Sequence, residues 1–472
     1  MLKELNPYVN VSVLPEPAIT PAVLTRFQCV VVTHAPRSVA AEWNEVCRAA
    51  TPAIPFIYSD VFGAAGFCFS DFGPAHLVKD KDGEPIRSTV VVGVNSVAPN
   101  AAAPGRLVVH VHDQKRHGFE DGDEVIFREV KGLTVLNDGK PRKVGSTMAY
   151  SFDLLLDAED VANPAFNVDY IEGGVVENTK IKTVTAFASL RERELAPVPS
   201  DDPVGMLLTP DLGKFGRPEQ LHIAFAAVEA FRTKHGHLPP VRDAAAVAEC
   251  VTLARNFCET AAASSVPNKL SVAPADVDAA VVTRVAALAR SEFSPMSAFF
   301  GGVVAQEVVK VTGKYSPLRQ WLYLDAFEIF TPAADPAAPA DVAAPASEFA
   351  PAGERYDGVA SIIGNSLQAR IMNQRVFLVG CGALGCEFLK SYALMGIGCG
   401  PEGRLSVTDM DRESFLEPSH TPHKVPHSLI RPSRPPPTRT PPPPPPLSAP
   451  RRHRGVELEP SIPLPRKQRG EA

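Results

Sequence analysis

The segment GCGALG, residues 380–385, has the residue types and spacing of a phosphate-binding turn. It follows an apolar run from Arg375 to Val379 and opens a helix-like stretch, which gives the order of strand, glycine turn and helix that such a turn requires. Gly380 permits a tight turn, Gly382 lets the backbone approach a phosphate, and Gly385 lets helix and strand pack closely. The helix N-terminus offers unpaired N–H groups and the positive end of its dipole to an anion.

Two aspartates end a second apolar run, RLSVTDMD, residues 404–411. An acid at the end of the second strand can accept hydrogen bonds from ribose hydroxyls, which makes Asp409 a candidate ligand. Its separation from the glycines is longer than the usual roughly 20 residues, and a loop insertion would absorb the difference. Asp411 fits either a ligand or a solvated loop acid. These residues predict a nucleotide site rather than a plain turn, and they leave ATP and an adenine dinucleotide both open.

The elements that would position these residues are two strands and one helix. The helix carries four apolar residues on one side, namely Leu384, Phe388, Tyr392 and Met395. So few elements leave an open sheet edge and an uncovered apolar face. We therefore expect this part of the chain to fold poorly.

No other residue pattern points to catalysis or to a metal. The eight cysteines form no C-x-x-C pair, match no zinc spacing and have no activating sequence context. Without a secretory signal, we expect reduced thiols that are mostly buried and inert. They are Cys29, Cys47, Cys68, Cys250, Cys258, Cys381, Cys386 and Cys399. The residues therefore give no catalytic residue and no metal ligand.

Composition excludes several classes of function. Of 472 residues, 45% are hydrophobic and 21% are charged, which is the balance of a soluble globular protein with about three domains. A net charge of −6 argues against a nucleic-acid partner, because phosphate binding relies on clustered Lys and Arg. No stretch reaches the roughly 18 to 20 apolar residues of a membrane helix, and the N-terminus does not resemble a secretory signal. We expect a location in the cytoplasm, the nucleus or both.

Two low-complexity stretches divide the chain. Residues 331–354 alternate Ala and Pro, which predicts an extended, semi-rigid linker, and residues 418–472 are rich in Pro and Arg, which predicts disorder. Before the linker, residues 1–75 alternate short apolar runs with a helix-like stretch, as in an α/β sheet. From about 76 to 180, short β runs with Asp-Gly turns predict a small β-barrel.

Helices are expected from about residue 200 to 312. One has Pro218 near its start and Gly236 at its stop. Another begins at Ser294, which can cap it, and close packing against another element would explain its internal pair Gly301-Gly302. Residues 321–330 then predict a terminal strand.

Six segments together resemble one family. VGCGALGCEFLKSYALMGIGCGPEGRLSVTDMD (379–411) resembles the start of the active adenylation domain of ubiquitin-activating enzymes. Five further segments resemble other parts of that family in its own order: LNPYVNVSVL (5–14), RHGFEDGDEVIFREVKGL (116–133), KFGRPEQLHIAFAAVEAFRTKHGHLPP (214–240), SPMSAFFGGVVAQEVVKVTGKYSPLRQWLYLDAFE (294–328) and RYDGVASIIGNSLQ (355–368). The likeness covers most of residues 1–411, and it shifts the expected nucleotide from a dinucleotide to ATP.

The resemblance implies an α/β fold with incomplete Rossmann-like adenylation domains, an inserted small β-barrel, an inserted helical bundle and a disordered Pro-rich tail. It divides the chain into the inactive adenylation domain, first part (1–75), the first catalytic-cysteine half-domain, a β-barrel (76–185), the helical bundle (186–265), the inactive adenylation domain, second part (266–330), the linker (331–354), the start of the active adenylation domain (355–417) and the tail (418–472).

The resemblance also implies an ATP-dependent, ligase-type chemistry. Such enzymes use ATP and Mg²⁺ to adenylate the C-terminal carboxylate of ubiquitin, pass the acyl group to a cysteine, and then serve ubiquitin-conjugating enzymes; a monomer is expected. On this basis Gly380, Gly382, Ala383 and Gly385 match the nucleotide loop, Asp409 matches the ribose-binding acid, and Asp411 matches the acid close to the adenylate.

The chain departs from the family pattern after Asp411. The family continues with a run that supplies Asn, Arg and Gln near the phosphates and then a Lys, whereas this chain reads RESFLEPSHTPHKVP. The Mg²⁺-binding Asp, the catalytic-cysteine domain, the ubiquitin-fold domain and the Arg-bearing first helix also have no match. We expect a truncated or misassembled piece that does not adenylate ubiquitin.

Two other readings stay open. The chain could be a non-enzymatic scaffold whose Pro-rich stretch, residues 431–450, is a peptide ligand in an extended left-handed helix. Alternatively, the glycine loop could hold NAD in an oxidoreductase, although nothing after Asp411 could build the rest of a dehydrogenase.

Overall fold

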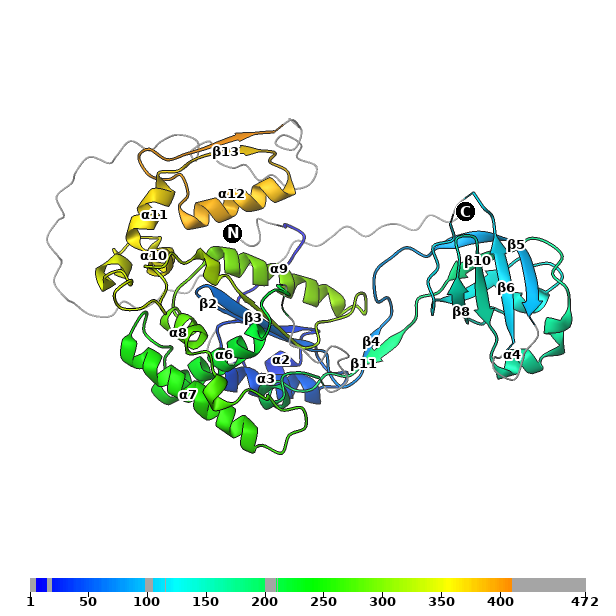
Figure 1. Ribbon diagram of the computed structural model, residues 1–472, viewed down its shortest axis with the longest axis horizontal. Helices are drawn as coiled ribbons and strands as arrows, with labels where there is room; N and C mark the ends of the chain where they lie inside the picture. The colour runs from blue at the N-terminus through cyan, green and yellow to red at the C-terminus, as the bar shows by residue number, and fades with distance from the viewer. Residues whose placement is uncertain are drawn as a thin grey trace, which may run out of the picture. The chain divides into compact units, whose positions relative to one another are not determined.

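A computed structural model describes residues 6–14, 19–97, 105–114, 116–199, 209 and 211–409 (Figure 1). Contacts group the chain into two units, Val13–Leu416 and Met1–Ser12 with Glu417–Ala472. In the second unit, the described residues 6–12 form a turn in which Val9 N–H donates to the Asn6 carbonyl at 3.2 Å. Every helix and strand that the structure describes lies in the first unit. The predicted tail, 418–472, and Asp411 lie outside the described residues.

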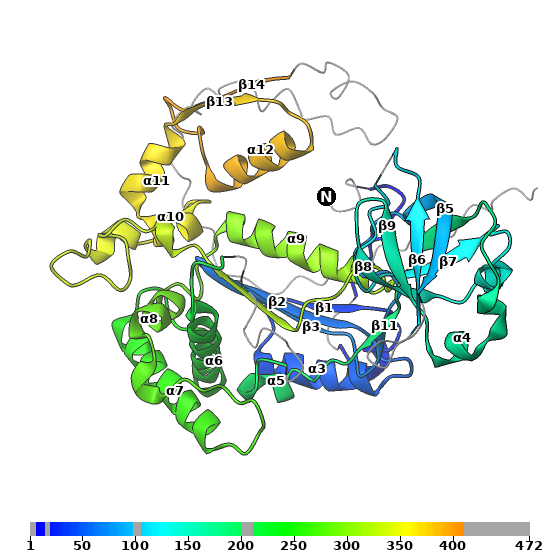
Figure 2. The same ribbon diagram turned by 45° about the vertical axis from the view of Figure 1, so that its right-hand side comes forward.

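A mixed four-stranded sheet in the order β1-β2-β3-β12 confirms the predicted α/β class. Its strands are β1 (Val30–Val32), β2 (Phe56–Phe62), β3 (Ala65–Asp71) and β12 (Trp321–Asp325). β1 and β2 are parallel, while β2–β3 and β3–β12 are antiparallel, so the Rossmann-like arrangement stays a prediction here. Helices α3 (Arg37–Ala49) and α9 (Ser294–Lys310) lie on opposite faces of the sheet, and the short α2 (Pro21–Leu24) contacts α3 (Figures 1 and 2). The predicted strand 321–330 ends at Asp325, and a 3-10 turn, η4 (Phe327–Ile329), follows.

Aromatic side chains fill the space between this sheet and the helices beside it. Phe67 lies 5.0 Å from Phe225 and 5.6 Å from Trp321 between ring centroids, and all three side chains are fully buried. β12 follows β3 by about 250 residues in sequence. This packing therefore joins the two predicted parts of the inactive adenylation domain, 1–75 and 266–330. Each buried aromatic ring contributes roughly 1.5–3 kcal/mol through removal of apolar surface from water.

A buried histidine in this core makes stability depend on pH. His222 shares a hydrogen bond with the Tyr323 hydroxyl at 2.6 Å and one with the Glu194 carbonyl at 2.7 Å. Burial, aided by the nearby positive charge of Arg37, lowers the pKa of His222 to about 3. The folded state therefore keeps this imidazole neutral, whereas the unfolded chain protonates it near pH 6.5.

We expect His222 to contribute fully to stability above pH 6.5 and progressively less as the pH falls toward 3. A His222→Asn chain should be less stable at pH 7, with a smaller further loss between pH 6.5 and 4 than the parent. Urea unfolding at pH 7, 6.5 and 4, followed by Trp fluorescence, measures the free energy of unfolding at each pH. His237→Asn, at an exposed site, is the control. Its free energy of unfolding should change with pH as that of the unsubstituted chain does. The same change of unfolding free energy with pH in all three chains would contradict the expectation.

A closed antiparallel barrel in the order β10-β5-β6-β9-β8-β7 confirms the predicted small β-barrel. Its strands are β5 (Ser88–Val97), β6 (Arg106–Val111), β7 (Glu124–Arg128), β8 (Arg142–Thr147), β9 (Ser151–Leu155) and β10 (Val175–Asn178). Alternating residues point inward, as in β6, where Leu107, Val109 and Val111 are buried. Two strands at the ends of the predicted range, β4 (His76–Val78) and β11 (Thr183–Thr185), pair with each other instead.

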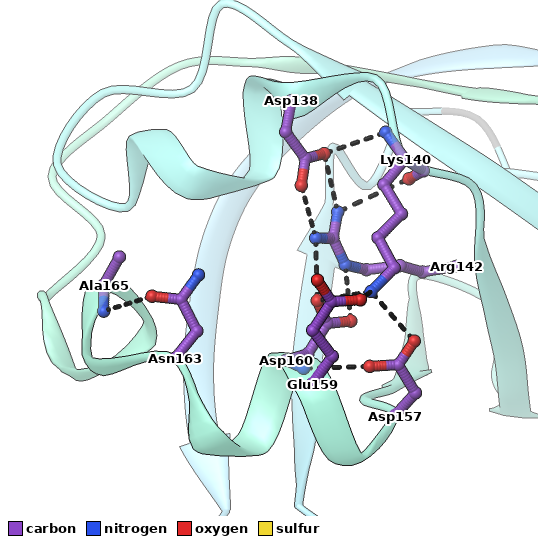
Figure 3. Close-up of polar contacts among 8 residues, drawn as sticks. All are labelled: Asp138, Lys140, Arg142, Asp157, Glu159, Asp160, Asn163 and Ala165. Carbon is purple, nitrogen blue, oxygen red and sulfur yellow. Dashed lines mark hydrogen bonds and ion pairs between the residues drawn. The ribbon is translucent and has the colours of Figure 1, made fainter.

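A buried ion network ties β8 to the segments that cover this end of the barrel (Figure 3). The Arg142 guanidinium, 2% exposed, donates to Asp160 at 2.9 Å and to Asp138 at 2.7 Å. Lys140 pairs with Asp157 and also with Asp160. Asp138 ends η1 (Thr134–Asp138), and Asp157 caps α4 (Ala158–Ala162), which η2 (Pro164–Asn167) follows. Although burial alone would raise the pKa of Asp138, hydrogen bonds from Arg142 and from the Lys140 N–H hold it below its ordinary value.

The helical region contains α5 (Glu192–Leu195), α6 (Arg217–His235), α7 (Ala244–Ala263) and α8 (Ala279–Ala287). The predicted helix from near Pro218 to Gly236 is confirmed as α6, which Gly236 ends in a left-handed conformation. α8 packs on both α6 and α7 through Val281, Val282 and Val285, although it follows residue 265, the predicted end of the bundle. A short 3-10 turn, η3 (Pro274–Asp276), precedes it.

Two predictions about α9 are wrong. Gly301 and Gly302 are exposed, and apart from chain neighbours and the backbone of α9 itself, no heavy atom of the described residues lies within 4 Å of a Cβ built on either. Close packing therefore does not explain the pair, since α9 contacts the sheet through Phe300 and Met296 on another side. Ser294 is the first helical residue rather than the cap, and its Oγ has no partner in the part of the chain that the structure describes.

The prediction of an extended linker over residues 331–354 is also wrong. The segment folds into turns and η5 (Ala346–Phe349), and its Ala334 and Phe349 are buried. The Arg242 guanidinium lies 3.5 Å from the Phe349 ring centroid and donates to the Ala334 carbonyl at 2.7 Å. Asp335 forms a two-point ion pair with Arg284. These contacts offset the entropy of ordering a Pro-rich chain.

The last described elements are α10 (Asp357–Ile363), α11 (Asn365–Met372), β13 (Arg375–Val379), α12 (Ala383–Met395) and β14 (Arg404–Thr408). β13 and β14 pair in parallel from Arg375↔Arg404 to Val379↔Thr408, and α12 lies along one face of the pair (Figures 1 and 2). This confirms the predicted strand, turn, helix and strand. Among the described residues, no helix combines the length and the apolar character needed to cross a membrane.

Candidate nucleotide-binding site

The glycine turn begins where β13 ends. Gly380 has a φ of +92°, a conformation that costs other residues strain, and its N–H donates to the Thr408 carbonyl at 2.8 Å. That hydrogen bond continues the β13–β14 pairing by one residue and brings the ends of both strands together. The turn predicted at Gly380 is confirmed.

Gly382 occupies the N-cap position of α12, with φ −66° and ψ −161°, and Ala383 is the first helical residue. Apart from Gly382 itself and the adjacent Cys381 and Ala383, no heavy atom of the described residues lies within 4 Å of a Cβ built on Gly382, so the backbone is open on that side. The helix has no acidic residue in its first turn. An anion could therefore approach the first N–H groups of α12 without meeting a side chain or a like charge from that turn. Contact with a nucleotide stays a prediction for both residues.

Gly385 has a packing role. A Cβ built on it would lie 2.2 Å from the Gly380 carbonyl oxygen and 3.0 Å from its carbonyl carbon, and both atoms belong to the backbone. Real Cβ contacts are essentially never this short. The close approach of helix and strand predicted at Gly385 is confirmed.

Asp409 lies directly after β14 and reaches back to the turn. Its Oδ2 accepts a hydrogen bond from the Cys381 N–H at 2.6 Å. Asp409 therefore braces the glycine loop, a role that the sequence analysis missed and that an acid at the end of a neighbouring parallel strand could have suggested. Its predicted contact with ribose stays a prediction. Asp411, the second predicted acid, lies outside the described residues.

Two thiols lie in the same loop. Cys381 is 3% exposed, and the thiol of the exposed Cys386 donates to the Cys381 carbonyl at 3.2 Å. Burial raises the pKa of the Cys381 thiol, and Cys386 and Asp409 raise it further. The expected burial is thus found for Cys381 but not for Cys386, because the first turn of α12 is open to solvent.

The predicted uncovered apolar face is confirmed. On the strand pair, Phe377 and Val379 are 66% and 69% exposed, and on α12, Leu384 is 68% exposed. Phe388 stacks on Tyr392 at 6.2 Å between ring centroids but remains 42% exposed. Only Met395, at the far end of the predicted apolar side of α12, packs against the core beside α9.

The described residues fit a phosphate better than a metal. The open backbone at Gly382 is a cradle that a Cβ would fill, next to a helix N-terminus. In contrast, no group of three His, Cys, Asp or Glu side chains in the described ranges could hold a metal ion. The loop is therefore suited to the phosphates of a nucleotide, and no step through Mg²⁺ can be assigned to these residues.

Comparison with known proteins shows which families the glycine loop and the rest of the chain resemble. Three family models match: the ubiquitin-activating enzyme E1 FCCH domain over residues 105–180, the ubiquitin-activating enzyme E1 four-helix bundle over 181–258, and the ThiF family over 356–417. The ubiquitin-activating enzyme E1 2 of Triticum aestivum is 38% identical over 411 residues, which cover 87% of this chain and 36% of the relative.

The resemblance to ubiquitin-activating enzymes E1 is confirmed. Ubiquitin-activating enzyme E1 2 of Arabidopsis thaliana is 38% identical, and ubiquitin-like modifier-activating enzyme 1 of Homo sapiens is 35% identical, each over 87% of this chain and 35% of the relative. The chain thus spans about a third of the length of these curated relatives of E1 type. The FCCH match falls on the β-barrel, and the ThiF match begins just before α10 and includes the whole glycine loop.

Proposed function

We propose that β13, the glycine loop, α12 and β14 form the ATP-binding corner of a Rossmann-like adenylation domain in a protein that activates ubiquitin. The observation that carries this proposal is the open backbone at Gly382, at the N-terminus of α12, with Asp409 braced against the same loop. The relatives of E1 type support ATP over a dinucleotide.

Each residue of the loop has a separate task in this proposal. The first N–H groups of α12, from Ala383 onward, hold phosphate oxygens, and Gly382 gives them room. Gly380 and Gly385 fix the turn, and Asp409 accepts from a ribose hydroxyl while it braces the Cys381 N–H. ATP supplies the adenylyl group that turns the ubiquitin carboxylate into a good acyl donor. The protein contributes orientation and stabilisation of phosphate charge.

For the whole protein, we propose ubiquitin as substrate, Mg²⁺ with the ATP, ubiquitin-conjugating enzymes as partners, a monomeric state and a location in the cytoplasm and the nucleus. These proposals rest on the family resemblance alone. For the chain as given, we infer that it does not adenylate ubiquitin, because RESFLEPSHTPHKVP replaces the polar run that the family places after Asp411.

A graft tests the proposed function. Residues 356–409 of this chain would replace the matching segment of the Triticum aestivum enzyme, and ubiquitin-dependent ATP–pyrophosphate exchange would be measured. We expect the grafted enzyme to keep its exchange activity. Asp409→Ala in the graft should lower the rate of exchange at least about tenfold. Glu402→Ala, at an exposed acid in the turn before β14, should leave the rate unchanged. Exchange that is insensitive to Asp409 would contradict the proposed role.

The same assay on the purified chain should give no exchange above the level without ubiquitin. Ubiquitin-dependent exchange by the chain itself would refute the inference that it does not adenylate ubiquitin.

A further inference from the structure

The two cysteines of the glycine loop occupy positions that helix geometry brings together. Cys381 immediately precedes the N-cap residue Gly382, and Cys386 is the fourth residue of α12. Side chains at these two positions pack against each other at the start of many helices. Here the Cys386 thiol points back over the turn, since its Sγ donates to the Cys381 carbonyl at 3.2 Å.

The two thiols also differ in accessibility, which suits sequential oxidation. Cys386 is exposed, so a small oxidant can reach it from solvent, whereas Cys381 is buried. Cys386 also contributes to the electrostatic environment of the Cys381 thiol, directly and through a side-chain hydrogen bond. A reachable thiol with a second thiol beside it is the arrangement of a sensor cysteine and its resolving partner.

We propose that Cys381 and Cys386 form a modification site, at which a peroxide converts the two thiols into a disulfide within the glycine loop, and that the disulfide form does not bind nucleotide. The second half of this proposal rests on the proposed function. The first half stands on the geometry of the pair.

The chemistry balances with one peroxide. The Cys386 sulfur attacks a peroxide oxygen, the O–O bond breaks, and a sulfenic acid and water form. The Cys381 sulfur then attacks the Cys386 sulfur, the S–O bond breaks, and a second water carries away the Cys381 proton. Two thiols lose two electrons in total, and hydrogen peroxide is reduced to two molecules of water.

The bond would change the loop at the place where phosphate is expected. Cys386 could no longer donate to the Cys381 carbonyl, and a sulfur–sulfur bond of about 2.05 Å would tie Cys381 to the first turn of α12. The open backbone of Gly382 lies between the tied positions, and the Cys381 N–H, which donates a hydrogen bond to Asp409, belongs to the first of them. Fixing them removes the freedom of the backbone to close on phosphate oxygens.

Peptide mapping of the full chain tests the modification. After hydrogen peroxide treatment, free thiols are blocked with N-ethylmaleimide and the chain is cut with trypsin, which releases residues 376–390 with both loop cysteines and 391–404 with Cys399. We expect peptide 376–390 to lose the mass of two hydrogen atoms, to take no label, and to recover with dithiothreitol. Cys381→Ser and Cys386→Ser should abolish the change, and Cys399→Ser, at another exposed thiol, should not. Sulfinic acid at Cys386, or linkage between chains, without the internal bond would overturn the proposal.

A separate measurement tests whether the disulfide prevents nucleotide binding. We expect Mg-ATP to slow formation of the internal bond, and the oxidised chain to bind ATP at least about tenfold more weakly than the reduced chain. Equal ATP binding by the oxidised and the reduced chain would overturn the proposal that the disulfide prevents nucleotide binding. If the bond forms but the reduced chain binds no ATP, the modification site stands and the proposed nucleotide function fails.

Discussion

Replacing Gly385 with alanine is expected to unfold the glycine loop and to abolish ATP binding. The new Cβ would lie 2.2 Å from the Gly380 carbonyl oxygen, and backbone atoms cannot move aside as a flexible side chain can. Overpacking of this kind costs about 1–3 kcal/mol, and more where backbone must shift. Hydrogen exchange of peptide 376–390 measures the unfolding, and equilibrium dialysis with labelled ATP measures binding.

Gly382→Ala is the matched variant. Its φ of −66° suits any residue, and beyond residues 381–383 no heavy atom of the described residues lies within 4 Å of the new methyl group. We expect hydrogen exchange like that of the parent but ATP binding weakened at least about tenfold, because the methyl group occupies the approach to phosphate. If Gly382→Ala binds ATP as well as the parent, the turn is structural and does not hold a phosphate.

Replacing Arg142 with methionine is expected to destabilise the β-barrel by up to about 3–5 kcal/mol, because the buried Asp160 carboxylate loses its buried partner and keeps only the partly exposed Lys140. Asp138 would lose both of its hydrogen bonds from the same guanidinium (Figure 3). Hydrogen exchange of peptides from β6 and β9 in increasing urea measures the stability of the barrel, which contains neither tryptophan of the chain.

Lys131→Met is the control for this prediction. Lys131 pairs with Glu172 at 2.7 Å, but both side chains are more than 60% exposed, and solvent screening leaves such a pair little effect on stability. Adding Asp160→Asn to Arg142→Met should recover part of the loss, because it removes a buried charge that only Lys140 still pairs with. Equal effects of Arg142→Met and Lys131→Met would contradict the role given to burial.

The parts of this fold that the sequence predicted correctly are those with local signals. The strand, turn and helix around Gly380 and Gly382, the helix that ends at Gly236, and the barrel with its Asp-Gly turns follow from residue types within a few positions of each other. The uncovered apolar face also followed from counting elements.

The predictions that failed depended on contacts distant in sequence. Alanine and proline content indicated an extended linker because composition does not show that Arg242 packs over Phe349, about 100 residues away. The pair Gly301-Gly302 suggested a close neighbour that is not found among the described residues. The brace from Asp409 to the Cys381 N–H was not predicted, because the sequence suggested only a ribose contact for the acid that follows β14.

We propose that the loop at residues 380–385 holds the phosphates of ATP. Titration of the purified, reduced chain with ATP and, separately, with NAD tests it most directly, with Gly382→Ala alongside. We expect saturable ATP binding that Gly382→Ala weakens, and no saturable binding of NAD. Saturable NAD binding without ATP binding, or ATP binding that Gly382→Ala leaves unchanged, would contradict it.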